Sequence, residues 1–279
     1  MIVATSVADL RRLRSSLAEP LGFVPTMGYL HDGHLSLARA ARAANRSVVA
    51  SIFVNPLQFG PQEDFAAYPR DPDRDLRLLS DSGVDLVFVP DVASIYPSGF
   101  SSSVAVGAVG DVLEGASRPG HFRGVATVVS ILFNLVRPTR AYFGQKDAQQ
   151  CVVIKKLVAD LAFPIEIVIG PTVRESDGLA LSSRNVYLSV PERIASRVLS
   201  ASLQAARRAF EAGRDDAETL RQIVRTMVGA EPLARLDYVS VADAASLDEL
   251  KVVDRPAVVS LAVWIGRTRL IDNDVLSSA

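Results

Sequence analysis

The sequence predicts an α/β protein, in which a Rossmann-like parallel sheet flanked by helices is followed by a smaller C-terminal α+β lid domain. Two observations lead to this prediction. Between residues 22 and 169, short apolar runs alternate with amphipathic stretches, which is the pattern of successive β-α-β units. Beyond residue 173 the alternation stops, and two long amphipathic helices precede strands of alternating polarity. We therefore expect domains at 1–172 and 173–279, with the second hinged as a lid.

The individual elements follow from the hydrophobic period and from the turn residues between runs. In the first domain we expect helices at 7–17, 34–45, 72–82, 125–135 and 148–161, and strands at 22–25, 48–54, 84–89, 104–106, 140–143 and 165–169. In the second domain we expect helices at 191–212 and 216–228, strands at 236–241 and 258–265, and a final segment RTRLIDN. Ligands bind at the carboxyl ends of parallel strands, so the loops after these strands are where we expect the site.

The composition excludes several classes of partner. The 30 basic and 31 acidic residues give a formal charge of −1, and no Lys/Arg cluster stands out, which disfavours nucleic-acid binding. No run reaches membrane-spanning length, and the first residues lack the pattern of a signal peptide. The single cysteine, Cys151, suits a reducing compartment. We therefore expect a cytoplasmic protein that binds neither nucleic acid nor membranes.

The stretch GFVPTMGYLHDGHLSL joins a short apolar strand to an amphipathic helix through a polar turn. His31 and His34 lie three residues apart in that turn, where free backbone N–H groups and the positive end of the helix dipole gather. Two imidazoles there can donate hydrogen bonds to a phosphate. The alternative is a pair of surface histidines at a helix start. A zinc site fits poorly, because His121 and Cys151 are the only other soft ligands.

Two further loops of the first domain carry polar side chains. In NPLQFGPQEDFAAYPRD, Gln58 offers an amide and Tyr68 a phenol, although a solvated loop with its aromatics packed on the core explains the segment equally well. In RPGHFRG, which precedes a strongly apolar helix, Arg118, His121 and Arg123 suggest anion handling, and a basic loop over the sheet edge is the alternative.

Two later segments repeat the phosphate-binding chemistry. The turn GQKD ends the strand at 140–143, and its Lys146 is one of only four lysines in the chain. A compact ammonium suits a phosphate as a point charge. Asp147 caps the next helix, and Gln150 faces the same way. The loop LALSSRNVYLS has neither helical nor strand period and is rich in hydrogen-bond donors, so we expect a mobile phosphate-binding loop.

Taken together, PTMGYLHDGHLSL, FVNPLQFGPQEDFAAYPRD, RPGHFRG, YFGQKDAQQ and the Ser-Ser-Arg triplet resemble the pantothenate synthetase (pantoate–β-alanine ligase) family of the nucleotidylyltransferase superfamily. The resemblance implies an ATP- and Mg²⁺-dependent ligase that condenses pantoate with β-alanine through a pantoyl adenylate, releasing AMP and pyrophosphate, and that forms a homodimer. The family commonly has Met at the position of Leu181 and Ala at that of Tyr29. Leucine is a near isostere of methionine, so only a small change in nucleotide packing is expected.

The resemblance also implies roles for individual residues. Catalytic roles fall to His31, His34, Lys146 and Arg184. ATP binding falls to Met27, Gly28, His31, His34, Gly144, Lys146, Asp147, Val173, Leu181, Ser182, Ser183 and Arg184. Pantoate and β-alanine binding falls to Pro25, Met27, Gln58, Tyr68 and Gln150. The metal ligands are open, and Asp75 is a candidate.

Three other functions share some of these features. An adenylyltransferase of the same superfamily would use the His-x-Gly-His turn and need no amine substrate. A class I aminoacyl-tRNA synthetase-like enzyme would be expected to carry a basic surface for tRNA, which the charge balance does not provide. A non-catalytic nucleotide sensor would bind ATP and leave it intact.

Overall fold

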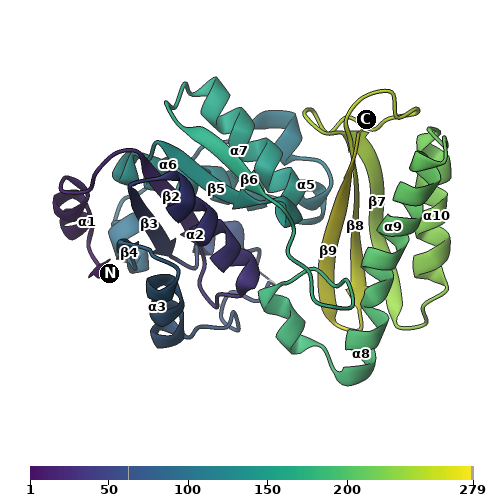
Figure 1. Ribbon diagram of the computed structural model, residues 1–279, viewed down its shortest axis with the longest axis horizontal. Helices are drawn as coiled ribbons and strands as arrows, with labels where there is room; N and C mark the ends of the chain where they lie inside the picture. The colour runs from purple at the N-terminus through teal and green to yellow at the C-terminus, as the bar shows by residue number, and fades with distance from the viewer. Residues whose placement is uncertain (62, 278–279) are drawn as a thin grey trace. The chain divides into compact units, whose positions relative to one another are not determined.

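The computed structural model describes residues 1–61 and 63–277, which form two compact units (Figure 1). The first unit comprises Met1–Gly144 and Val153–Pro171, and the second comprises Gln145–Val152 and the residues from Thr172 onward. The short segment Gln145–Val152 therefore groups with the C-terminal part of the chain, although it directly follows a strand of the first unit.

The first unit is built on a six-stranded sheet in the order β1-β4-β3-β2-β5-β6, with every pair of neighbours parallel. The strands are β1 (Ile2–Ala4), β2 (Leu21–Thr26), β3 (Ser47–Ile52), β4 (Leu86–Phe88), β5 (Arg140–Gly144) and β6 (Glu166–Gly170). In register, Phe23 of β2 pairs with Val49 of β3 and with Ala141 of β5. The predicted Rossmann-like parallel sheet is confirmed.

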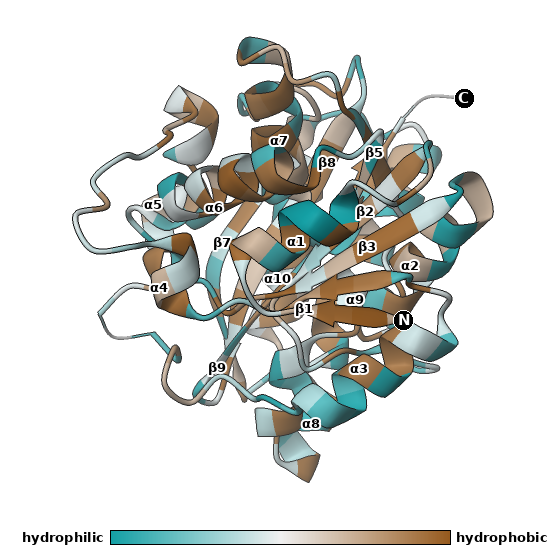
Figure 2. Ribbon diagram, turned by 90° about the vertical axis from the view of Figure 1, so that its left-hand side faces the viewer, coloured by the Kyte–Doolittle hydropathy of each residue, from teal (hydrophilic) through white to brown (hydrophobic). Residues whose placement is uncertain are grey.

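Helices cover both faces of this sheet, because successive side chains of each strand point to opposite sides. The helices are α1 (Val7–Arg14), α2 (Asp32–Ala44), α3 (Pro72–Asp81), α4 (Val92–Ile95), α5 (Glu114–Ser117) and α6 (His121–Val136), with 3-10 turns η1 (Pro56–Gln58) and η2 (Gly107–Gly110). On one face, Val24 of β2 belongs to the cluster formed with α2 and Leu79 of α3. On the other, Phe23 and Phe143 meet Phe133 of α6 edge to face. The strands are mostly hydrophobic, whereas α1 and α3 carry hydrophilic stretches (Figure 2).

Four details of the first unit differ from the predictions. No strand forms at 104–106, where the Val104 N–H donates to Thr127 Oγ1 over 2.9 Å instead of to a neighbouring strand. The edge strand β1 was missed, because three residues are too short to show a period. Helix α6 begins at His121, four residues before the predicted 125, directly after Gly120 with a φ of 85°. Helix α2 likewise begins earlier than predicted, with His31 as its N-cap.

The second unit holds an antiparallel sheet in the order β7-β8-β9, packed against helices. Its strands are β7 (Ala234–Asp243), β8 (Ala257–Ile265) and β9 (Thr268–Leu276), and its helices α8 (Val190–Ala195), α9 (Arg197–Glu211) and α10 (Ala217–Gly229). The 3-10 turn η3 (Gln145–Asp147) leads into α7 (Ala148–Asp160), whose first turns belong to this unit and whose remainder belongs to the first. The predicted α+β character is confirmed.

Two predictions for this unit need correction. The expected helix at 191–212 is divided at Ser196, which is fully buried and whose hydroxyl donates to the Arg193 carbonyl over 2.7 Å. The segment expected to lack helical structure contains a 3-10 turn, η4 (Ser183–Tyr187). Across the described parts of both units, no helix combines the length and apolar character needed to cross a membrane.

Candidate active site

The turn after β2 lies at the carboxyl edge of the parallel sheet and is held by a buried carboxylate. Gly28 and Tyr29 both have positive φ, 83° and 49°, so the chain turns sharply before α2. Asp75, in the first turn of α3, accepts the N–H of Tyr29 over 2.6 Å and that of Leu30 over 2.8 Å. Only 1% of the Asp75 surface is exposed. Asp75 therefore positions the turn through two charge-assisted hydrogen bonds.

The two histidines of the turn form a capping box at the start of α2. The Nδ1 atom of His31 accepts the Gly33 N–H over 3.2 Å, and that of His34 lies 3.4 Å from the backbone nitrogen of His31. Their ring centroids are 4.1 Å apart. Because a ring nitrogen that accepts a hydrogen bond carries no proton, these contacts place the proton of each ring on Nε2. Each imidazole therefore carries an Nε2–H donor at a helix N-terminus, where anions are favoured.

Gln58 ends the 3-10 turn η1 after β3 and contacts a second predicted site residue. Its Nε2 lies 3.2 Å from the sulfur of Met27, and its Oε1 accepts from Asn55 Nδ2 over 3.0 Å. Asn55 is 1% exposed and also donates to the Gly124 carbonyl over 3.1 Å, while its Oδ1 accepts the Leu57 N–H. The structure thus brings Met27 and Gln58 together and fixes the amide of Gln58.

Tyr68 lies within an aromatic cluster on the loop that follows Gln58. Its side chain is 5% exposed, and its ring packs edge to face on Phe59 with centroids 6.0 Å apart. Phe59 in turn packs on Phe65 at 5.4 Å. Pro25, near the end of β2, is half-buried. Aromatic packing on the core, the alternative weighed for this loop, is therefore present, and substrate contact by Tyr68 stays a prediction.

Arg118 and His121 have partners inside the protein. The Arg118 Nε donates to Glu63 Oε1 over 2.9 Å, and its Nη1 lies 3.2 Å from His121 Nε2. His121 Nδ1 lies 2.8 Å from the Gln58 carbonyl oxygen. Burial and the adjacent Arg118 charge lower the pKa of His121 to about 4, so the ring is neutral at physiological pH. Of the three groups expected to handle an anion, His121 is thus neutral, Arg118 is paired with Glu63 and Arg123 is exposed, and anion binding by this segment stays a prediction.

In the second unit, the turn that carries Lys146 is held by an asparagine from the last strand. Asn273 of β9 is 4% exposed, and its Nδ2 donates to the carbonyls of Gln145 and Lys146 over 3.0 and 2.8 Å. Gln145 Nε2 returns a hydrogen bond to Asn273 Oδ1 over 3.0 Å. Lys146 Nζ lies 3.6 Å from the carboxylate of Asp147. The structure therefore brings Lys146 and Asp147 together on a firmly held turn, and Gln150 lies half-buried on the following helix.

The Ser-Ser-Arg segment is also held by local hydrogen bonds. Ser182 caps η4 by accepting the Arg184 N–H over 3.2 Å, and Ser183 is 9% exposed. Leu181 donates its N–H to the Val173 carbonyl over 3.0 Å, which closes the loop between them. Two predicted pairs of neighbours, Val173 with Leu181 and Ser182 with Arg184, thus lie together.

Ion pairs anchor the base of this loop. Arg174 makes two hydrogen bonds of 2.6 and 2.9 Å to Asp272, which is 2% exposed. Arg193 donates to both Glu175 and Asp177. The hydrogen bond from Arg193 lowers the pKa of Asp177 to about 2. Ion pairs therefore stabilise the segment from which the loop carrying Ser182 and Ser183 extends.

The sequence model of the family described as pantoate-beta-alanine ligase matches residues 2–275. The chain belongs to this family. It is 60% identical to the pantothenate synthetase of Herpetosiphon aurantiacus, with 99% of this chain and all of that protein aligned.

Solved structures of the family agree with the fold. The pantothenate synthetase of Thermus thermophilus superposes with a TM-score of 0.94 at 49% identity, covering 98% of this chain and 99% of that one. The pantoate-beta-alanine ligase of Francisella tularensis, complexed with beta-gamma ATP and beta-alanine, superposes with a TM-score of 0.79 at 35% identity, covering 99% and 97%.

The positioning roles of several residues were not found from the sequence. Asp75, Asn273 and Glu63 each bind a segment far away in the chain, and nothing in a local window reveals such a partner. The usable signal for Asn273 was the run of three polar residues, 272–274, within the last strand. Gln58 and Gln150 belong to different units, so their predicted pairing around one substrate stays a prediction.

The described residues offer no ready-made metal site. Among residues 1–61 and 63–277, no group of three or more His, Cys, Asp or Glu side chains could hold a metal ion. Asp75, the suggested ligand, already accepts two backbone N–H groups, and its role as a metal ligand stays a prediction.

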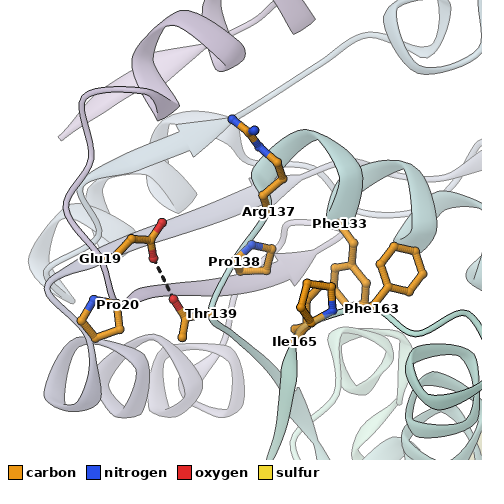
Figure 3. Close-up of a pocket in the computed structure, with 9 residues that line it drawn as sticks. Glu19, Pro20, Phe133, Arg137, Pro138, Thr139, Phe163 and Ile165 are labelled. Carbon is orange, nitrogen blue, oxygen red and sulfur yellow. Dashed lines mark hydrogen bonds between the residues drawn. The ribbon is translucent and has the colours of Figure 1, made fainter.

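A hollow at the opposite edge of the sheet was not expected from the sequence (Figure 3). Its volume is about 500 Å³, and Pro20, Thr139 and Ile165 line it directly before β2, β5 and β6. Glu19 accepts the Thr139 hydroxyl hydrogen bond over 2.7 Å there. Because ligands bind at the carboxyl ends of parallel strands, this amino-end hollow is separate from the predicted site.

Proposed function

We propose that this chain is an ATP-dependent ligase that condenses pantoate with β-alanine to pantothenate through a pantoyl adenylate. Membership of the family supports the reaction, and the geometry of the His-x-Gly-His turn is the single observation that carries the chemistry. Both imidazoles there carry their proton on Nε2, at the N-terminus of a helix on the carboxyl edge of a parallel sheet. That arrangement favours a polyphosphate.

The chemistry explains why ATP is needed. A carboxylate does not react with an amine at neutral pH until one of its oxygens becomes a leaving group. In the proposed first step, a carboxylate oxygen of pantoate attacks the α-phosphorus of ATP in line, the bond to the β-phosphate oxygen breaks, and pyrophosphate leaves. In the second step the amine of β-alanine attacks the acyl carbon, and AMP and pantothenate are released. No protein nucleophile takes part.

His31 and His34 are proposed to stabilise negative charge on the phosphates. Their Nε2–H groups are neutral donors, which strengthen as charge develops during transfer. Met27 and Gly28, in the same turn, are proposed to contact the nucleotide. Asp75 acts through the turn, by holding its backbone.

Residues of the second unit complete the proposed ATP-binding set. Lys146 supplies a point charge for phosphate, with Asp147 next to it in sequence and Gly144, the last residue of β5 in the first unit, two residues before it. The phosphates that leave as pyrophosphate are proposed to be bound by Ser182, Ser183 and Arg184. Val173 and Leu181 are proposed to pack against the nucleotide. The hydrogen bonds that hold both loops support this, because catalysis by donors needs them fixed before the reaction.

Pantoate is proposed to be bound by Gln58 and Gln150, with Pro25, Met27 and Tyr68 around the substrates. The contact between Gln58 and Met27 supports this group within the first unit. The C-terminal unit is proposed to close as a lid, which would keep water from the reactive mixed anhydride until the amine arrives.

We further propose a cytoplasmic homodimer that uses Mg²⁺. The single buried cysteine suits a reducing compartment. Since the described residues offer no group of three metal-binding side chains, Mg²⁺ is proposed to arrive on the phosphate oxygens of ATP. Sedimentation of the purified chain tests the dimer, and titration of Mg²⁺ against activity tests the metal.

The decisive experiment follows ATP consumption and product identity, with pantoate and β-alanine added singly and together. We expect AMP, pyrophosphate and pantothenate only with both substrates, together with pantoate-dependent exchange of labelled pyrophosphate into ATP. Adenylylation that stops at a stable nucleotide product would instead identify an adenylyltransferase. ATP left intact in every combination would identify a nucleotide sensor.

Alanine variants then test the residues. His34→Ala and Lys146→Ala should each slow pantoate-dependent pyrophosphate exchange by about a hundredfold or more, as is typical when one donor to a transition state is lost. Arg39→Ala, on the exposed face of α2, and Lys156→Ala, on α7, are matched controls that should stay near wild type. An exchange rate near wild type in His34→Ala or Lys146→Ala would refute that residue's role.

A further inference from the structure

The backbone of Gln58 is held by a cluster that the reaction itself does not use. Its carbonyl oxygen lies 2.8 Å from His121 Nδ1 and 3.4 Å from Arg118 Nη2. A carbonyl oxygen only accepts hydrogen bonds, so His121 carries its proton on Nδ1 and donates it to Gln58. The Nε2 of the same ring is then an acceptor, and Arg118 Nη1 donates to it over 3.2 Å.

This hydrogen-bond arrangement has a defined direction and a defined charge. Arg118 is held by the Glu63 carboxylate, which accepts from both Nε and Nη2 of the guanidinium. Protonation of His121 would place a hydrogen on Nε2, which would face the Arg118 guanidinium and be repelled by it. These hydrogen bonds therefore require a neutral His121. Through Arg118 they also link the Glu63 carboxylate to the carbonyl of Gln58.

The packing beneath the cluster leaves Gln58 little freedom. Gly124, in the first turn of α6, lies so close to η1 that a Cβ there would be 2.2 Å from the Leu57 carbonyl oxygen. The carbonyl of Gly124 accepts from Asn55 Nδ2 over 3.1 Å. The first turn of α6 and η1 thus meet backbone to backbone, and Gln58 cannot shift without breaking contacts on both sides.

The side-chain amide of Gln58 is oriented from the same platform. Asn55 has its Oδ1 toward the Leu57 N–H and its Nδ2 toward the Gly124 carbonyl, so its amide has one possible orientation. The same Nδ2 donates to Gln58 Oε1, which leaves Gln58 Nε2 as the donor toward Met27 and the predicted substrate site. A substrate oxygen that accepts a hydrogen bond is therefore the group that Gln58 suits.

We propose that Glu63, Arg118 and His121 are positioning residues for pantoate, which act by fixing the backbone of Gln58 so that its amide N–H meets a substrate oxygen. This inference rests on the proposed role of Gln58 in pantoate binding. Its consequence is selective: loss of the cluster weakens pantoate binding and leaves ATP and β-alanine binding unchanged.

The test measures KM for each of the three substrates in His121→Ala and His121→Asn. We expect His121→Ala to raise KM for pantoate roughly tenfold, the effect of freeing one positioned donor, with KM for ATP and β-alanine within about twofold of wild type. His121→Asn keeps a donor near the position of Nδ1 and should recover most of the loss. Arg118→Ala, which removes the arginine–carboxylate pair of the cluster, should also raise KM for pantoate, and Arg12→Ala, which breaks the exposed pair of Arg12 with Asp9, is its control.

A double-mutant cycle separates positioning from general damage. If His121 acts through Gln58, then Gln58→Ala with His121→Ala should have the same kcat/KM for pantoate as Gln58→Ala alone, within about twofold. Additive losses, equal increases in KM for all three substrates, or an unchanged pantoate KM in His121→Ala would each overturn the inference. A wild-type protein that makes no pantothenate would instead refute the proposed function, so the two failures are distinguishable.

Discussion

Replacing Asp75 with alanine should destabilise the first unit and slow adenylation, because one side chain holds the whole turn after β2. The change removes both acceptors of the Tyr29 and Leu30 N–H groups, and Leu30 is only 1% exposed. A buried donor left without a partner costs about 1–3 kcal/mol, and water can reach the half-buried Tyr29 more easily. We therefore take about 4 kcal/mol for the two bonds.

A smaller opposing effect must be subtracted. Burial raises the pKa of Asp75 although its two backbone hydrogen bonds and Arg74 lower it, which means that the buried carboxylate is itself under a desolvation penalty. Removing the carboxylate relieves that penalty, so the net loss is smaller than the sum for the two bonds, about 3 kcal/mol. For a unit of this size each kcal/mol lowers Tm by about 2–4 °C, so we expect a fall of roughly 6–12 °C.

The effect on activity follows from geometry. His31 and His34 come directly after the turn, and a displacement of about 1 Å at a catalytic group costs about a hundredfold in rate. Thermal unfolding followed by circular dichroism measures the first effect, and pantoate-dependent pyrophosphate exchange measures the second. Asp73→Ala, exposed in the same helical turn as Asp75, is the control and should lose about 0.5 kcal/mol or less. An Asp75→Ala protein within about 1 kcal/mol and about threefold of wild type would refute the reasoning.

Two other predictions concern stability. His121 has a folded pKa of about 4 against 6.5 for the free residue, so its stabilisation is complete above pH 6.5 and is lost as pH falls from 6.5 toward 4. The charged groups that face this ring are Arg118, Glu63 and Glu114. Because of the lowered pKa, the difference in unfolding free energy between wild type and His121→Asn, measured by urea unfolding across that range, should shrink as pH falls. A constant difference would contradict the assignment. Asn273→Ala removes the hydrogen-bond donor to two partly buried carbonyls and should cost about 1–2 kcal/mol and slow pyrophosphate exchange; near-wild-type unfolding and exchange would contradict it.

The cluster around Gln58 changes how one sequence motif is interpreted. Arg118 and His121 suggested anion binding, because positive side chains before a helix commonly serve that purpose. In the structure, Glu63 neutralises Arg118, and burial together with Arg118 keeps His121 neutral. The same side chains therefore serve to hold the backbone of Gln58, and the charge that the sequence shows is cancelled within the cluster.

Local pattern determined most of the secondary structure of this protein. Helix α2 and strand β3 follow from the hydrophobic period, and the inner side of α2 is the predicted one, with Leu35 and Ala38 buried. The predictions failed where elements are too short for a period, as in β1, or where a buried hydrogen bond decides the outcome, as at Ser196 between α8 and α9.

By itself, the sequence determined the parallel sheet, the α+β C-terminal part, the position of the loops that carry His31, Gln58 and Lys146 after their strands, and the family. These features depend on side-chain period and on runs of neighbouring residues, which a single sequence displays directly. Only the tertiary structure decided what holds the motifs in place. Asp75 lies 45 residues from Leu30, His121 lies 63 from Gln58, and Asn273 lies 127 from Lys146. Each of these side chains satisfies a backbone group of a distant turn, and such a partner exists only once the chain has folded.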